Sequence, residues 1–258
     1  MHSKDCNMIE EAQRPTEAKK KKGTLYYASL IIRILKGLPL SLAESIMRYL
    51  PGPLGAYLRY NFYKRRLKYL GKKVLIDEGV YILNPENISI DDNSWIDKNV
   101  ILLSGDPSRG LVERKYWLKE NKAYKGKIGE LKIGKNCHIA PFVLIQAHGG
   151  VAIGDSCGVA SGARIYSTSH HYRNLHEDDG KLYKFSPRAP VEDQFIIIGA
   201  VVMEDNTALG LNSVILPGVT IGKNSWVGVS SYVTSDIPPN SIASKCPAKV
   251  IKERQVLN

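Results

Sequence analysis

The sequence places an apolar residue at every sixth position over a long C-terminal stretch. The members of this series are Ile197, Met203, Leu209, Ile215, Ile221, Val227 and Val233. A period of six matches neither the period of about 3.6 residues of a helix nor the two-residue alternation of a single strand. It is typical of a chain that turns a corner after every short strand, three such strands completing one coil of a parallel β-helix. A β-sandwich with short strands, the alternative, does not hold such a step.

The same step recurs upstream, with interruptions. Its upstream members are Ile90, Ile96 and Leu102, then Ile133, Ile139 and Ile145, and, after a slip of two, Ile153, Val159 and Ile165, with Val74 and Val80 as candidate first members. Together these groups predict about six coils over residues 74–243, interrupted by loops at 104–130 and 168–195. The open ends of such a column are sheet edges, which we expect the N-terminal region and the chain after Ser235 to cover.

The remaining segments flank this mainly β domain. Residues 1–23 form a polar tail that we expect to be disordered, with no signal peptide, and residues 244–258 a C-terminal tail. Residues 24–73 are expected to form a helical extension. Its apolar part contains Arg33 and Lys36, which argues against a membrane-spanning helix.

The helical extension carries much of the excess positive charge of the chain, whose formal net charge is +11 over 258 residues. Its cations alternate with aromatic residues, as an interfacial helix requires, so residues 24–73 are expected to bind an anionic membrane surface. The alternative is a solvated basic face whose aromatic rings pack on the column. No nucleic-acid-binding module accompanies the charge, so no nucleic-acid partner is expected. The four cysteines form no metal-binding spacing, so we expect no bound metal. Their usage suits a reducing compartment, so we expect a cytoplasmic protein. The basic extension would then hold it on the inner face of the membrane.

Three stretches of the sequence carry a resemblance to a known family. They are IYSTSHHY, LGLNSVILPGVTIGKNSWVGVSSYVTSDIPPN and ASKCPAKVIK. The region from Ile133 to Arg254 resembles the hexapeptide-repeat acyltransferases, which include galactoside, maltose and serine acetyltransferases. The resemblance implies a left-handed β-helix, a winding that the spacing alone does not establish. It also implies a homotrimer that transfers an acetyl group from acetyl-CoA to a saccharide hydroxyl, in the biosynthesis of a surface polysaccharide or another glycan.

The resemblance also suggests functional residues. The family's general base, a histidine at the start of the long loop, matches His170. An imidazole titrates near pH 6.5 and can take the proton of a hydroxyl that attacks a thioester. His171 is the rival base or an acceptor contact, and His148 is either an acceptor contact or a corner histidine bonded to backbone. The positions that match the family's acetyl-CoA contacts are Gly210, Leu211, Gly228, Val229, Lys249 and Lys252.

Gly210 and Leu211 lie where the family places a backbone donor to the oxyanion, and Lys249 and Lys252 match its basic positions. Both lysines could equally be ordinary solvated residues. Three other functions remain open: an N-acetyltransferase of an amino sugar, a γ-type carbonic anhydrase and a non-catalytic β-helix scaffold. The carbonic anhydrase needs three histidines on zinc. Its usual histidine pair lies five residues apart on adjacent strands, whereas His138 and His148 of the repeat region are ten apart.

Overall fold

The computed structural model describes residues 40–105, 115–171 and 181–254. They belong to two compact units, of which the first ends at Ile46 and the second begins at Met47. The described residues of the first unit, 40–46, are helical. Among the described residues, no helix has the length and apolar character needed to cross a membrane.

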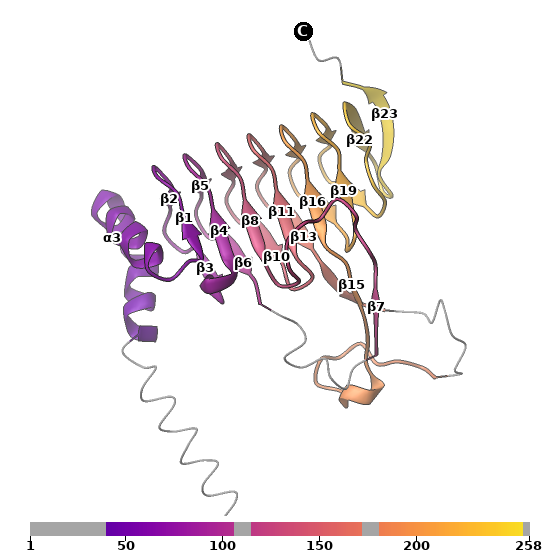
Figure 1. Cartoon of the computed structure of the whole chain (residues 1–258), viewed down its shortest axis with the longest axis horizontal. Helices are drawn as coiled ribbons and strands as arrows, with labels where there is room; N and C mark the ends of the chain where they lie inside the picture. Colours follow the sequence, from indigo (N-terminus) through magenta and orange to yellow (C-terminus); the bar gives the residue numbers. More distant parts are fainter. Residues whose placement is uncertain (1–39, 106–114, 172–180, 255–258) are drawn as a thin grey trace, which may run out of the picture. The chain divides into compact units, whose positions relative to one another are not determined.

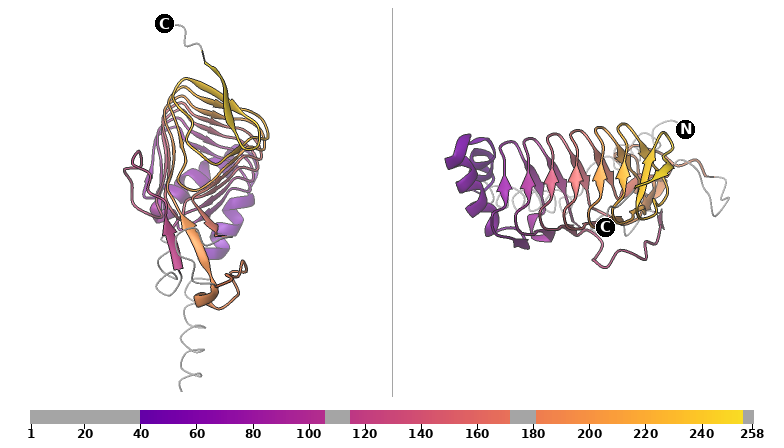
Figure 2. Two further views of the ribbon diagram at one scale, coloured as in Figure 1. Left: turned by 90° about the vertical axis from the view of Figure 1, so that its right-hand side faces the viewer. Right: turned by 90° about the horizontal axis from the view of Figure 1, so that it is seen from above.

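The second unit consists of helix α3 (Gly52–Lys64) followed by a three-sided column of short strands (Figures 1 and 2). The first sheet stacks β1 (Tyr69–Leu70), β4 (Ile88–Ile90), β8 (Leu131–Ile133), β11 (Val151–Ile153), β16 (Val201–Met203) and β19 (Thr220–Ile221). The second sheet stacks β2 (Leu75–Ile76), β5 (Trp95–Ile96), β9 (His138–Ile139), β12 (Gly158–Val159), β17 (Ala208–Leu209), β20 (Trp226–Val227), β22 (Ser241–Ser244) and β23 (Lys249–Glu253). The third sheet stacks β3 (Tyr81–Leu83), β6 (Ile101–Leu103), β10 (Leu144–Gln146), β13 (Arg164–Tyr166), β18 (Val214–Ile215) and β21 (Tyr232–Val233).

This arrangement is the predicted left-handed parallel β-helix, and it contains the expected six coils. The six-residue step marks the inward position of each strand. Ile133, Ile139 and Ile145, for example, occupy the three faces of one coil and are fully buried. Because each strand points one apolar side chain inward, the stacked coils bury a continuous hydrophobic core.

The structure corrects the predicted period at both ends. Ile197, the predicted first member of the series, is only half-buried and lies on β15 (Phe195–Ile198), outside the column. At the other end the inward series begins at Leu70, so the strands start before the boundary expected at residue 74. Val74 and Val80 are buried, but they lie two residues before the inward positions Ile76 and Ile82.

The two interruptions of the column come together in a small sheet, which we call the arm. Its strands are β7 (Lys115–Leu118) from the first interruption and β14 (Thr168–His170) and β15 from the second. β15 pairs in parallel with β7 and antiparallel with β14, and Figure 1 shows β7 and β15 side by side beside the column. Because β15 belongs to the arm, the second interruption runs from residue 167 to residue 200, beyond the expected 168–195.

Both ends of the column are covered, as the sequence predicts. At the first coil, the buried guanidinium of Arg59 on α3 donates from Nε to the backbone oxygen of Ile76 at 2.8 Å. Tyr60 donates from its hydroxyl to the backbone oxygen of Gly71 at 3.0 Å. At the last coil, β23 folds back antiparallel on β22, ending the second sheet. Side chains therefore satisfy backbone groups that an open sheet edge leaves unpaired.

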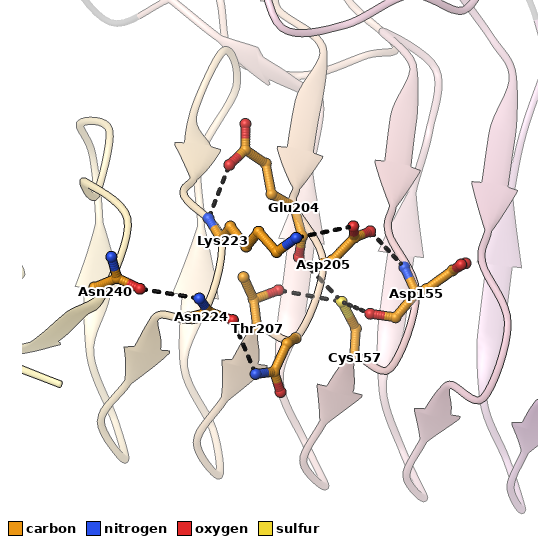
Figure 3. Close-up of polar contacts among 9 residues, drawn as sticks. Asp155, Cys157, Glu204, Asp205, Thr207, Lys223, Asn224 and Asn240 are labelled. Atoms are coloured by element: carbon orange, nitrogen blue, oxygen red, sulfur yellow. Dashed lines mark hydrogen bonds and ion pairs between the residues drawn. The ribbon is translucent and has the colours of Figure 1, made fainter. Parts of the chain in front are cut away.

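The corners of the column are held by ladders of polar side chains (Figure 3). Asn206 donates to Asn224, which in turn donates to Asn240, with both nitrogen–oxygen distances 2.9 Å. All three have a positive φ, between 54° and 61°, which asparagine tolerates better than most residues. The buried thiol of Cys157 donates to the backbone oxygen of Glu204 at 3.2 Å, so this cysteine is a small core residue.

Candidate active site

A groove of about 730 Å³ lies where the third sheet meets the arm. It is lined by Asn84, Ser104, Gly105, Gln146, His148, Tyr166, Thr168, Ser169, His170, Pro187, Ile196, Val214, Leu216 and Tyr232. One wall is the outer face of the third sheet and the other is the arm, so segments far apart in the sequence build one concave surface. A concave surface with a few convergent polar groups is the usual form of a small-molecule site.

His170 ends strand β14 and lines this groove. Its backbone lies in register with Ile196 of β15, which fixes the strand that carries the ring. Nδ1 of His170 is buried, and no side chain or backbone group among the described residues forms a hydrogen bond with it. The described residues therefore leave the hydrogen-bonding capacity of this nitrogen unused.

Hydrogen bonds from the column hold the start of β14 in place. The side-chain oxygen of Gln146 accepts hydrogen bonds from the backbone nitrogen and the hydroxyl of Thr168, at 3.1 and 2.8 Å. The fully buried Ser167 donates from its hydroxyl to the backbone oxygen of Gln146 at 2.6 Å and accepts from the backbone nitrogen of Gly149 at 2.8 Å. These contacts position the backbone just before His170 against the turn that carries His148.

His148 lines the same groove, so the structure brings two of the three predicted histidines together. Burial lowers the pKa of His148 below the usual value of histidine, because desolvation disfavours the charged ring. Among the described residues its side chain has no hydrogen bond to backbone, which disfavours the alternative of a corner histidine bonded to backbone. A neutral imidazole on the groove wall can donate to or accept from a bound hydroxyl.

His171 lies away from the groove, although it follows His170 directly. Its side chain is 2% exposed and stacks on Phe195, with ring centroids 4.6 Å apart. The ring of Trp117 lies on β7 with its centroid 6.0 Å from that of His171. Consecutive residues of a strand point to opposite faces, so His170 faces the groove and His171 packs within the arm.

The residues predicted to contact acetyl-CoA lie at other places in the chain. Gly210 and Gly228 follow strands of the second sheet, and each donates its backbone N–H to the next coil, to Val227 at 2.7 Å and Ala243 at 2.8 Å. The predicted donor Gly210 is thus already engaged in coil stacking. In the described part of the chain, the N–H groups of Leu211 and Val229 have no such partner, and both side chains are about half exposed, at 47% and 54%.

Lys249 and Lys252 lie on β23, where both are exposed. None of the six predicted acetyl-CoA contacts lines the groove that contains His170. Within the part of the chain that the structure describes, no three His, Cys, Asp or Glu side chains are grouped so that they could hold a metal ion.

Several groove residues escaped the sequence analysis. Gln146 and Tyr166 each follow an inward residue, Ile145 and Ile165, and so point outward from the third sheet into the groove. Asn84 donates to the backbone oxygen of Ser104 at 2.7 Å and forms part of the groove wall near the first coils. The alternation of side chains along a strand could have identified Gln146 and Tyr166. Each follows an inward residue of the third sheet, and β13, which contains Tyr166, leads to the strand of His170.

Comparison with known proteins agrees with this architecture. The model of the family described as hexapeptide repeat of succinyl-transferase matches residues 200–235. Galactoside O-acetyltransferase of Escherichia coli K12 is 35% identical over 123 residues, which are 48% of this chain and 54% of that protein. The chain is similar to the hexapeptide-repeat acyltransferases. The chain spans only about half the length of that relative.

Two further similarities cover more of this chain. The dTDP-4-amino-4,6-dideoxy-D-glucose acyltransferase of Escherichia coli is 26% identical over 187 residues, 72% of this chain and 82% of that protein. A solved structure of AntD, an N-acyltransferase from Bacillus cereus in complex with dTDP and coenzyme A, aligns with a TM-score of 0.57 and 25% identity. That alignment covers 76% of this chain and 89% of AntD.

Proposed function

We propose that this protein transfers an acetyl group from acetyl-CoA to a hydroxyl of a saccharide, with His170 as the general base. The observation that carries the proposal is the buried, unpartnered Nδ1 of His170 in a groove lined by polar side chains. The relatives' names add support, since galactoside O-acetyltransferase acts by name on a sugar hydroxyl. The acceptor is proposed to be a sugar of a surface polysaccharide or another glycan.

The reaction needs one proton transfer and one oxyanion donor. A ring nitrogen of His170 takes the proton as the acceptor oxygen attacks the thioester carbonyl carbon, which becomes tetrahedral. Collapse of this intermediate breaks the carbon–sulfur bond, and the coenzyme A thiolate leaves and takes up the proton. A backbone N–H aimed at the developing oxyanion lowers the barrier, and the N–H of Leu211 is the candidate.

The proposed assembly is a homotrimer in which neighbouring columns complete each site. In one chain the base lies in the groove at the third sheet, whereas Leu211 and Val229 lie at corners outside that groove. A second copy that presents these corners to His170 would bring both halves together. Aromatic side chains on the outer faces of the column support such packing, since Trp95, Trp226 and Tyr232 are 41%, 38% and 37% exposed.

Coenzyme A carries phosphate groups, which require cations at the far end of the site. Lys249 and Lys252 on β23 are proposed to supply them, because both are exposed. We place the reaction in the cytoplasm. The free thiols of Cys137, Cys157 and Cys246 suit a reducing compartment.

Transfer to an amine is the second candidate. The relative of which the chain covers 82% is named as an acyltransferase of an amino sugar nucleotide. A groove with a general base can serve an amine or a hydroxyl, because both lose a proton as they attack the thioester. The two reactions differ in product, since one yields an ester and the other an amide.

The test is acetyl transfer from labelled acetyl-CoA to a panel of sugars, amino sugars and nucleotide sugars. We expect a labelled product that hydroxylamine cleaves, because esters react with hydroxylamine and amides do not. A hydroxylamine-resistant product would establish the N-acyltransferase instead. Binding of acetyl-CoA without transfer to any acceptor would favour the non-catalytic scaffold.

A further inference from the structure

The outer face of α3 combines apolar side chains with cations. The face of α3 that packs on the first coil contains the buried residues Gly55, Arg59 and Tyr63. Leu54 and Tyr57 lie on the opposite face, because three or four residues separate neighbours on one side of a helix. Their side chains are 65% and 66% exposed, and Tyr49 just before the helix is 67% exposed.

Cations lie at the end of this face and at the neighbouring corner of the column. Lys64 and Arg65 end the outer face of α3 and are exposed. Lys72 and Lys73, also exposed, lie at the first corner of the column, next to Gly71, which α3 contacts through Tyr60. In the described part of the chain, none of these four cations forms an ion pair with a carboxylate.

The surrounding sequence contains no negative charge to balance them. From Met47 to Ile76 the chain has eight lysines and arginines and no aspartate or glutamate. One member of this set, Lys68, pairs with Glu130 at 2.6 Å, and Arg59 is used in the cap. We call the surface formed by Tyr49, Leu54, Tyr57, Lys64, Arg65, Lys72 and Lys73 the cap surface. The carboxylate of Asp92 lies beside it and accepts a hydrogen bond from the backbone nitrogen of Lys72 at 2.7 Å, so the four cations leave the cap surface with a net positive charge.

We propose that the cap surface binds the headgroup region of a membrane that contains anionic lipids. Leucine and tyrosine side chains enter the boundary between headgroups and acyl chains, while lysine and arginine meet lipid phosphates and carboxylates. Charge complementarity favours this partner, and the exposed apolar residues favour lipid over nucleic acid, whose binding rests on phosphate contacts and base stacking. The proposal goes beyond the acetyl transfer, whose chemistry requires no surface.

Sedimentation of the full-length protein with lipid vesicles tests the proposal. We expect binding to vesicles of phosphatidylcholine mixed with phosphatidylserine and little binding to phosphatidylcholine alone. The double variant Lys64→Glu/Arg65→Glu should bind the anionic vesicles at least about 100-fold more weakly, since each cation near such a surface adds a several-fold gain in affinity. The double variant Leu54→Ser/Tyr57→Ser should also bind more weakly, at unchanged charge.

Matched variants away from α3 serve as controls. Lys132→Glu/Lys135→Glu makes the same charge change at exposed positions of the third coil, and Ile251→Ser replaces a half-exposed apolar residue on β23. Both should bind like the wild type, and circular dichroism should show that every variant is folded. Wild-type binding by the α3 variants would overturn the proposal and place any vesicle binding elsewhere in the chain. Equal binding to both vesicle types, or tighter binding to duplex DNA than to anionic vesicles, would overturn it as well.

Discussion

At the residue scale, the two histidines of the groove have different surroundings. His170 is held by a strand of the arm and keeps a buried ring nitrogen without a partner among the described residues. His148 lies on the turn between β10 and β11, where burial lowers its pKa. One ring is therefore suited to take a proton, and the other to form hydrogen bonds in its neutral form.

Replacing His170 by alanine should remove transfer and preserve binding of the donor. Because a general base contributes a factor of about 10² to 10⁴, we expect turnover to fall by that amount, while calorimetry shows nearly unchanged acetyl-CoA binding. Turnover within about tenfold of the wild type would show that His170 is not the base.

The lowered pKa of His148 predicts a specific pH dependence of stability. The unfolded chain protonates this ring near pH 6.5, whereas the folded chain does so only at lower pH, so the unfolded state binds more protons in between. The free energy of unfolding should therefore fall as the pH drops below about 6.5. Its slope with pH should be smaller than the slope produced by the uptake of one full proton. His148→Gln removes this contribution. As the pH is lowered from about 8 to about 5, the melting temperature of the variant should therefore rise relative to that of the wild type. A difference that is constant with pH would contradict this assignment.

The proposed base could be predicted from sequence, but its surroundings could not. The motif around His170 points to this residue through its resemblance to the family, and the structure places it in the groove. Gln146, Asn84 and Tyr232 come from separate coils, and only the stacking of those coils places them in one groove. His171 shows the limit of a motif, since of two adjacent histidines one lines the groove and the other packs against Phe195.

At the element scale, each corner of the column constrains the coil beside it. The carboxylate of Asp155 accepts a hydrogen bond from the backbone nitrogen of Lys135 at 2.8 Å. A Cβ at Gly134 would lie 2.5 Å from the same carboxylate oxygen and 2.6 Å from the backbone of Gly154. Glycine at this corner is therefore required by the close approach of the next coil.

The asparagine ladder leads to a prediction that reverses the usual order of alanine and glycine. Asn224 has a φ of 61° and hydrogen bonds to Asn206 and Asn240 (Figure 3). Asn224→Gly loses the hydrogen bonds, whereas Asn224→Ala also places a Cβ in the left-handed region, at a cost of about 1 kcal/mol. Urea denaturation should therefore show the alanine variant to be less stable than the glycine variant by about this amount. An alanine variant as stable as the glycine variant would contradict the role of the positive φ.

The coils could be predicted because their signal is local and repeated, whereas the arm could not. Ile197 continues the six-residue step by number, yet its strand pairs with β7, which lies far away in the sequence. A sequence period shows where apolar residues lie along the chain. It does not show which part of the structure buries them. The same limit applies to Val74 and Val80, which are buried at a position other than the predicted one.

At the scale of the whole molecule, the proposed trimer separates the base from the oxyanion donor. Light scattering should give a mass three times that of one chain. If each site forms between two copies, mixed refolding of His170→Ala with Leu211→Pro, which removes the proposed donor N–H, should restore activity. For a random mixture about a quarter of the sites are intact, so we expect about a quarter of the wild-type rate. Two folded variants that stay inactive after mixing would show that base and donor act within one chain.

The guanidinium of Arg59 also bears on how long the column can become. A stack of identical coils contains nothing that sets its own length, because each coil offers the next one the same backbone groups. At the first coil two of those groups, the carbonyls of Ile76 and Gly71, are occupied by Arg59 and Tyr60, so they are not available to a strand of a neighbouring molecule. The charge buried under α3 thereby acts against end-to-end polymerisation, and it keeps a repeating fold from growing into a filament.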